Sequence, residues 1–207
     1  MKEKIWDFWA KRYDRLWVQK YSLRPTRELI IKLIEQDYKK DRAIEVLDLG
    51  CGPGELIYGL NKAFNNFTIT GLDLSREMIQ VSKERNPSVN HIQMDAKDLD
   101  SLEDKFEIII STHSIPYYKD LDKLMEDLKN LLEDEGRIYM AFASGNSFYD
   151  KLALSFVKLT TGPASYPSDK RFKELIEGSF KAESLNIIKE RQFMPRIALY
   201  KLEKVIR

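Results

Sequence analysis

From residue 44 to residue 143 the chain alternates short apolar runs with stretches of helical spacing, and this alternation constrains the fold more than any other feature. The apolar runs are Ile44–Leu49, Phe67–Leu72, Val89–Met94, Phe106–Ile110 and Arg137–Ala143. The helical stretches between them are Glu55–Asn65, Ser75–Arg85 and Leu121–Leu132. Strands that alternate with helices form right-handed βαβ units, in which helices cover both faces of a parallel sheet. The sequence therefore predicts an α/β fold with an open, doubly wound, mostly parallel sheet.

Both flanks of this region have patterns of their own. Glu3 to Gln19 has the spacing of an amphipathic helix with an aromatic face, formed by Ile5, Phe8, Trp9, Tyr13, Leu16 and Trp17. A second helix is expected after Pro25, a residue suited to a first helical turn. Beyond residue 143, an apolar segment within Gly145–Pro167 precedes a helix over Asp169–Phe180. Two strands, Leu185–Ile188 and Ile197–Leu202, then predict a hairpin.

Composition narrows the class of protein. The 207 residues suit one domain, and 34 basic against 33 acidic residues give a net charge of +1, without the basic excess typical of nucleic-acid binding. No run approaches the ~18–20 apolar residues of a membrane span. One cysteine and two histidines provide neither a disulfide nor a Cys/His metal cluster. We therefore expect a cytoplasmic protein without a metal or a membrane span, for which a nucleic-acid partner is disfavoured.

The chemistry-bearing motif follows the first predicted strand and reads Asp48-Leu49-Gly50-Cys51-Gly52-Pro53-Gly54-Glu55. Glycines at alternate positions let the backbone turn tightly and let a ligand lie against it. The loop opens a helix, whose free N–H groups favour an anionic group such as a carboxylate. The alternative is a tight turn with no ligand.

Two common nucleotide motifs do not fit this loop. A dinucleotide fingerprint, Gly-x-Gly-x-x-Gly, requires a third glycine where this chain has Glu55 or Ile57, and a carboxylate there repels a diphosphate. The Gly-Lys-Ser/Thr of a triphosphate-binding loop is also missing. Two carboxylates instead follow the next strands: Asp73 is suited to ribose hydroxyls and Asp95 to an adenine amine. Ser75 is expected to cap the helix after Asp73.

Four segments, residues 46–54, 71–79, 94–99 and 106–138, resemble in this order the motifs of class I S-adenosylmethionine-dependent methyltransferases. Val46 to Gly54 resembles their first motif, Gly71 to Ile79 their second and Met94 to Leu99 their third, while Phe106 to Ile138 resembles their fourth strand, helix and fifth strand. The opening Phe8-Trp9-Ala10-Lys11-Arg12-Tyr13-Asp14 is similar to the first helix of the small-molecule branch that contains quinone C-methyltransferases. The resemblance implies a seven-stranded sheet with an antiparallel last strand and helices at the N-terminus.

The resemblance also implies that S-adenosylmethionine is the cofactor and assigns residues to it. The methionine part would lie on the three glycines, and Asp48 would hold the loop or the ammonium group. The ribose would lie on Asp73, and the adenine against Met78, Asp95 and Ala96. Ser111 would lie near the sulfonium, and Tyr13 would close over the cofactor. The full expected cofactor set is Tyr13, Asp48, Gly50, Cys51, Gly52, Gly54, Asp73, Leu74, Met78, Asp95, Ala96 and Ser111.

Several of these residues also have an ordinary structural explanation. Met78 and the tryptophans of the first helix could be core residues, and Cys51 could simply fill space. His113 is the candidate general base, with a structural loop histidine as the alternative. Tyr117, Tyr118, Phe148 and Tyr149 are expected to wall the substrate pocket.

We therefore expect in-line methyl transfer to an unidentified small molecule, with alignment and a dry pocket as the protein's main contributions. A non-catalytic cofactor-binding subunit that activates a partner, or an NAD(P)-dependent oxidoreductase with an atypical glycine loop, are the alternatives. The expected organisation is one domain over 1–207. It consists of a helical cap (1–40), a cofactor-binding core (44–143), a substrate cover (145–167) and a C-terminal helix with hairpin (168–207).

Overall fold

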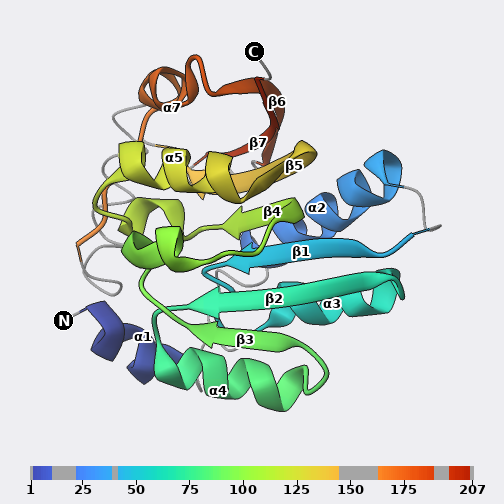
Figure 1. Cartoon of the computed structure of the whole chain (residues 1–207). Helices are drawn as coiled ribbons and strands as arrows, with labels where there is room; N and C mark the ends of the chain where they lie inside the picture. Colours follow the sequence, from blue (N-terminus) through green and yellow to red (C-terminus); the bar gives the residue numbers. More distant parts are fainter. Residues whose placement is uncertain (1, 11–21, 39–41, 145–162, 189–195, 206–207) are drawn as a thin grey trace.

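The computed structural model describes residues 2–10, 22–38, 42–144, 163–188 and 196–205 (Figure 1). Two helices precede the sheet, α1 (Lys2–Ala10) and α2 (Arg24–Asp37). The strands are β1 (Ile44–Leu49), β2 (Phe67–Asp73), β3 (Asn90–Gln93), β4 (Phe106–Thr112), β5 (Leu132–Ala143), β6 (Phe180–Ile188) and β7 (Ile197–Lys204). The helices between them are α3 (Glu55–Ala63), α4 (Arg76–Arg85), η3 (Ala96–Ser101), η4 (Ile115–Tyr117), α5 (Leu121–Leu131) and α7 (Asp169–Ile176).

The seven strands form one sheet in the order β3-β2-β1-β4-β5-β7-β6. Strands β1 to β5 pair in parallel, whereas β7 is antiparallel to both of its neighbours. The predicted doubly wound sheet with an antiparallel last strand is thus confirmed. From β1 the chain winds first toward β3 and then returns to β4, so the strand order reverses between β1 and β4. Ligands of open α/β sheets bind at this reversal, beyond the carboxyl ends of the strands.

Alternate residues of each strand bury opposite faces of the sheet, as the period of two requires. One face packs against α2 and α3 around Ile30, Ile57 and Val46, while the other packs against α5 and α7 around Leu47, Leu128 and Phe172 (Figure 1). Helix starts follow local chemistry. Pro25 lies in the first turn of α2, and Ser75 caps α4 by accepting a hydrogen bond from the Met78 amide at 3.1 Å.

Some boundaries differ from the sequence-based expectation. Strand β5 begins at Leu132, not Arg137, because Leu132 pairs with Phe106 across an irregularity in the β4–β5 ladder. The helix expected to run to Phe180 ends at Ile176, and after Gly178 in a left-handed conformation Phe180 begins β6. Of the first predicted helix, the described part is α1. Its Phe8 is 58% exposed, although the ring meets that of Trp9 edge-on at 5.3 Å.

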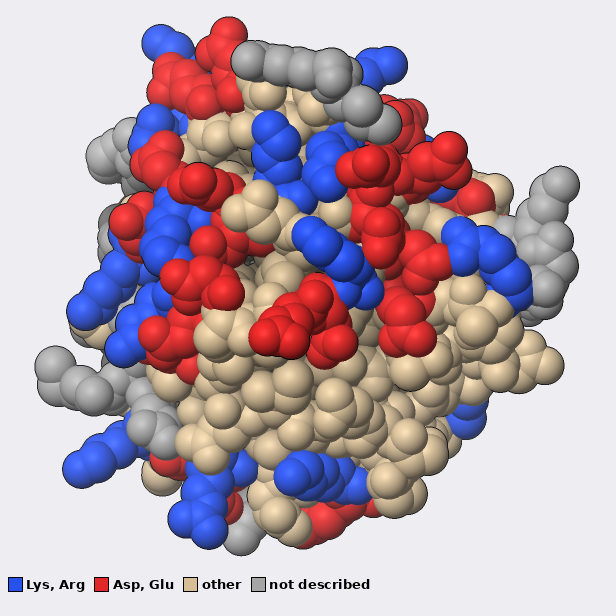
Figure 2. All heavy atoms as spheres, viewed as in Figure 1, with Lys and Arg blue, Asp and Glu red and all other residues tan. Residues whose placement is uncertain are grey.

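On the face shown in Figure 2, basic and acidic side chains are interspersed. Within the described ranges, no helix has the length and apolar character needed to cross a membrane. Groups of three or more metal-ligating side chains are likewise not found among the residues that the structure describes.

Candidate functional site

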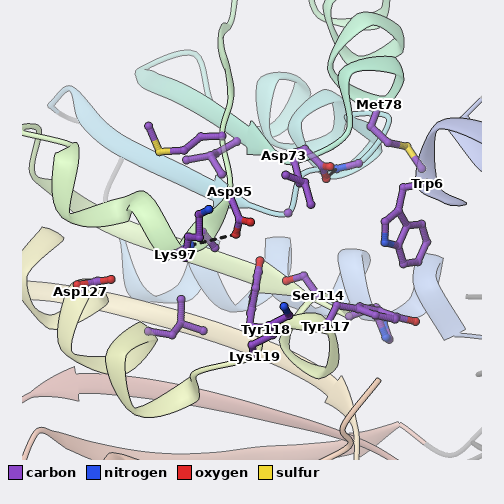
Figure 3. A pocket seen from close by; sticks show the side chains of 18 of the residues that line it. Trp6, Asp73, Met78, Asp95, Lys97, Ser114, Tyr117, Tyr118, Lys119 and Asp127 are labelled. Carbon is purple, nitrogen blue, oxygen red and sulfur yellow. Dashed lines mark hydrogen bonds between the residues drawn. The ribbon is translucent and has the colours of Figure 1, made fainter. Parts of the chain in front are cut away.

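A cavity of about 300 Å³ opens at the carboxyl ends of the strands, where the strand order reverses (Figure 3). Trp6 and Met78 lie toward one end of it and Asp127 of α5 toward the other. Its lining comes from α1, Gly50 and Gly52 of the glycine loop (residues 50–54), the first turn of α4, the ends of β2 and β4, the segments that follow β2, β3 and β4, and α5. The lining residues are Trp6, Gly50, Gly52, Leu72, Asp73, Leu74, Met78, Met94, Asp95, Ala96, Lys97, Thr112, His113, Ser114, Tyr117, Tyr118, Lys119, Asp120, Lys123, Leu124 and Asp127.

The three glycines of the loop all have positive φ, but the space around them differs. A Cβ on Gly50 would lie 2.6 Å from the Ser114 Cβ, and a Cβ on Gly54 would lie 2.2 Å from the Ser82 Oγ. At Gly52, by contrast, nothing lies within 4 Å of the added atom. Gly50 and Gly54 are therefore needed for close packing of the protein, and Gly52 is the glycine that leaves space for a ligand.

Asp73, at the end of β2, holds this loop in place. Its two carboxylate oxygens accept hydrogen bonds from the Gly52 and Ser75 amides, each at 2.9 Å. Burial raises the pKa of the Asp73 carboxyl, and these same amide hydrogen bonds oppose that rise. Each oxygen keeps a second lone pair, so Asp73 can still accept a hydrogen bond from a ligand hydroxyl in the cavity.

Asp48 lies beneath the loop, where it is 1% exposed and outside the cavity lining. It shares a strand face with Ile44 and Val46, the face covered by α2 and α3. Within the described ranges, neither of its carboxylate oxygens has a hydrogen-bond partner. Burial, with a contribution from the nearby Asp73, raises the pKa of Asp48 to about 7, although Arg27 opposes the shift. Asp48 is thus a buried acid that a cationic ligand group at the loop would stabilise.

Helix α1 covers the cavity beside α4. Asp7 accepts a hydrogen bond from the Ser75 hydroxyl at 2.6 Å and another from the Glu77 amide at 3.3 Å. This contact places the half-buried Trp6 at the cavity, where its ring meets that of Tyr117 edge-on at 4.9 Å. Sequence reasoning missed Trp6, because the residue falls beside the periodic aromatic stripe and only its large ring set it apart.

The adenosine-binding residues expected from the sequence lie together. Met78, 2% exposed, lines the cavity from α4, and Leu74, Asp95 and Ala96 line it from the ends of β2 and β3. Asp95 is partly used by the protein, since one of its oxygens accepts a hydrogen bond from the Lys97 amide at 3.2 Å.

His113 begins the loop between β4 and α5 and has a φ of 59°, in a region that costs energy for a residue with a side chain. The Thr26 hydroxyl donates its hydrogen to the Ser22 carbonyl. His113 Nε2 lies 3.3 Å from Thr26 Oγ1 and must therefore be the donor in the His113–Thr26 hydrogen bond. Burial and the nearby Arg27 lower the pKa of His113 to about 4. At neutral pH the ring is therefore uncharged and only weakly basic.

Hydroxyl groups form the cavity wall below the glycine loop. The Ser111 and Ser114 hydroxyls are 2.6 Å apart. The Ser114 hydroxyl also donates a hydrogen bond to the Leu49 carbonyl at 3.2 Å. Burial raises the pKa of Tyr118, whose hydroxyl group stays protonated. Tyr117, Tyr118 and Ser114 line the cavity, whereas Ser111 lies behind Ser114 and is fully buried.

The structure thus divides the predicted cofactor residues into two layers. Gly50, Gly52, Asp73, Leu74, Met78, Asp95 and Ala96 line the cavity, as do the predicted pocket residues His113, Tyr117 and Tyr118. The second layer is Asp48, Cys51, Gly54 and Ser111, which are buried and do not line the cavity. Tyr13, Phe148 and Tyr149 lie outside the described residues, as does most of the expected substrate cover.

The arrangement fits an adenosyl ligand with an amino-acid end. Space at Gly52, the N-terminus of the nine-residue helix α3 and the buried acid Asp48 suit a zwitterionic group that carries a carboxylate and an ammonium. Asp73 and Asp95 offer acceptors for ribose and adenine along the same edge of the sheet.

Comparison with known proteins identifies the family. The family described as "Methyltransferase domain" matches residues 40–186. A malonyl-[acyl-carrier protein] O-methyltransferase of Bacillus cytotoxicus is 31% identical over 129 residues, which cover 61% of this chain and 45% of that protein. The protein of the same name from Priestia megaterium is 28% identical over 201 residues, or 95% of this chain and 69% of that protein. This chain spans about half the length of most curated relatives that it matches.

Solved structures share the fold. The magnesium protoporphyrin IX methyltransferase of Synechocystis PCC 6803, solved with bound SAH (S-adenosylhomocysteine), superposes with a TM-score of 0.77. The superposition covers 99% of both chains at 17% sequence identity.

Proposed function

We propose that this chain, which belongs to the family of methyltransferase domains, transfers a methyl group from S-adenosylmethionine to a carboxylate oxygen of a small molecule. When bound, S-adenosylmethionine would supply the methyl group of its sulfonium: the acceptor oxygen would form a bond to the methyl carbon as the sulfur–methyl bond breaks, leaving S-adenosylhomocysteine as a neutral thioether. The glycine loop then binds the methionine end, Asp73 binds the ribose, and Met78, Asp95 and Ala96 bind the adenine. Trp6 covers this site from α1.

The observation that carries the acceptor class is the setting of His113, whose Nε2 donates a hydrogen bond to Thr26 Oγ1 and whose pKa is lowered by burial. A general base works best when its pKa lies near the working pH, and a pKa of about 4 is far below it. An alcohol, phenol or ammonium acceptor must lose a proton, whereas a carboxylic acid is already ionised at neutral pH. The curated relatives named as malonyl-[acyl-carrier protein] O-methyltransferases support the same class of acceptor.

His113 then shapes the acceptor side of the cavity, where its strained backbone and its contact with Thr26 fix the ring. The predicted substrate cover at 145–167 remains part of this proposal. It is supported at its described end, where the Ser165 amide donates a hydrogen bond to the Pro116 carbonyl at 2.7 Å, next to Tyr117.

A two-stage experiment tests this. Calorimetry with S-adenosylmethionine, S-adenosylhomocysteine and, as a control ligand, NADH first measures cofactor binding, for which we expect affinity for the two adenosyl ligands alone. The enzyme is then incubated with the cofactor and matched panels of carboxylic acids, phenols and amines, and S-adenosylhomocysteine release is quantified by mass spectrometry. Methyl esters that mild alkali hydrolyses are expected as products. Turnover of phenols or amines without any carboxylate turnover would refute the acceptor class and leave the cofactor assignment intact.

A further inference from the structure

The glycine loop is held from behind by the C-terminal end of α4. Arg85 Nη1 donates a hydrogen bond to the Pro53 carbonyl at 2.7 Å, and Asn86 Nδ2 donates one to the Gly54 carbonyl at 2.9 Å. Neither Pro53 nor Gly54 lines the cavity, so these contacts act on the side of the loop that faces away from a ligand. Two consecutive carbonyls of the loop are therefore fixed by one helix.

This contact is buried and closely packed. Asn86 is 2% exposed and Ser82 is fully buried. Gly54 approaches them so closely that an added Cβ would lie 2.5 Å from the Asn86 Nδ2. Ser82 is fixed in turn by the His91 ring on β3, at 2.7 Å between Oγ and Nε2. The end of α4 thus has little freedom to move relative to the loop or the sheet.

The same helix reaches the adenosine end of the cavity. Met78, in its first turn, lines the cavity, and the capping Ser75 binds Asp7 of α1. Ten helical residues span about 15 Å, so α4 acts as a short rigid element between the two ends of the site. Displacing its C-terminal contacts would shift the loop but leave the Met78 end in place.

We propose that Arg85 and Asn86 are positioning residues that set the glycine loop for the amino-acid end of the cofactor. Neither residue lines the cavity, and both would act by pre-organising the loop, so that less ordering is needed when the ligand binds. The inference rests on the proposed role of the loop in holding the methionine end. Its signature is a loss of affinity that depends on which part of the ligand is present.

The test compares two ligands of the full chain by calorimetry. S-adenosylhomocysteine has both the adenosine and the amino-acid end, whereas 5′-methylthioadenosine lacks the amino-acid end. Arg85→Met is expected to lower the affinity for S-adenosylhomocysteine about tenfold, equivalent to about 1.4 kcal/mol of binding free energy. The affinity for 5′-methylthioadenosine should fall less than about twofold. Arg85→Lys, which keeps a charged donor, should recover part of the loss. Lys83→Met removes a charge from the same exposed helix turn and should leave both affinities within about twofold of the unsubstituted protein.

Asn86→Ala provides the second variant and is expected to show the same ligand-selective loss. Should it fail to fold, the Arg85 variants still decide, because Arg85 is only half-buried. An equal loss for both ligands would indicate a general structural effect and overturn the inference, as would no loss for either ligand. If the unsubstituted protein bound 5′-methylthioadenosine as tightly as S-adenosylhomocysteine, the loop itself would not hold the amino-acid end. That result would refute the proposed role of the loop independently of the variants.

Discussion

Alanine substitution of Gly52 and of Gly54, made separately, distinguishes a ligand contact from a packing contact within one loop. Both residues have left-handed backbones, with φ of 53° and 74°, and alanine in that region costs about 1–2 kcal/mol. At Gly52 no further cost arises in the free protein, since the new Cβ meets nothing within 4 Å. At Gly54 the new Cβ would lie 2.2 Å from Ser82 Oγ, which adds an overpacking cost of about 1–3 kcal/mol.

The two variants should therefore fail in different assays. A chain of this size loses about 2–4 °C in Tm per kcal/mol. We expect thermal unfolding, followed by circular dichroism without ligand, to fall by about 2–8 °C for Gly52→Ala and about 4–20 °C for Gly54→Ala. In calorimetry, a methyl group in the ligand's space at Gly52 should weaken S-adenosylhomocysteine about 5- to 150-fold, from the same overpacking cost.

Either of two results would refute this reasoning. If Gly52→Ala kept its affinity within about twofold, the ligand would not lie against Gly52. If Gly54→Ala were as stable as Gly52→Ala, the close contact with Ser82 would not explain the glycine.

Three further predictions use the same protein. Asp73→Asn removes a charge-assisted acceptor and should weaken S-adenosylhomocysteine by about 1.5–3 kcal/mol, or about 10- to 150-fold, and unchanged calorimetry would remove the ribose assignment. The pKa of Asp48 is about 7 in the folded protein and 3.8 in an unperturbed carboxyl, so the folded state keeps the proton up to a higher pH. The stability that the protonated side chain provides at low pH is therefore lost as the pH rises from 3.8 to about 7. Relative to Asp48→Asn, the unsubstituted protein should therefore lose up to about 4 kcal/mol in urea unfolding across that range, whereas a constant difference would contradict the buried-acid reading. Trp6→Ala removes a ring from the cavity wall and should raise the Kd of S-adenosylhomocysteine about 2- to 10-fold, the effect of losing an aromatic contact of about 0.5–1.5 kcal/mol with the ligand, whereas an unchanged Kd would argue against a cover role.

The sequence predicted the fold well because its signals are local. Apolar runs of strand length, helical spacing and a capping serine each depend on neighbouring residues, and the order of elements then limits the topology. Where a boundary was wrong, a charged run hid the strand: Glu133 to Glu135 lie exposed in β5, so the pattern begins only at Arg137. The pairing of Leu132 with Phe106 is a contact between distant parts of the chain.

The site was only partly predictable for the same reason. Gly52 and Gly54 look alike in the sequence, and the difference between them arises from Ser82 and Asn86, about 30 residues further along the chain. The low pKa of His113 depends on burial and on Arg27, which a motif does not reveal. The position of Asp48 could have been foreseen, because it continues the alternation of Ile44 and Val46 toward the α2–α3 face.

The position of Trp6, edge-on to Tyr117 at the cavity, provides an intrinsic fluorescence signal for ligand binding. Indole emission responds to the polarity and the rings around it, and the Trp6 ring is half-buried at the cavity wall. The chain has three tryptophans, so replacing Trp9 and Trp17 by phenylalanine would leave Trp6 as the single emitter. Candidate acceptors could then be ranked by fluorescence titration, with no label and before any product has been identified.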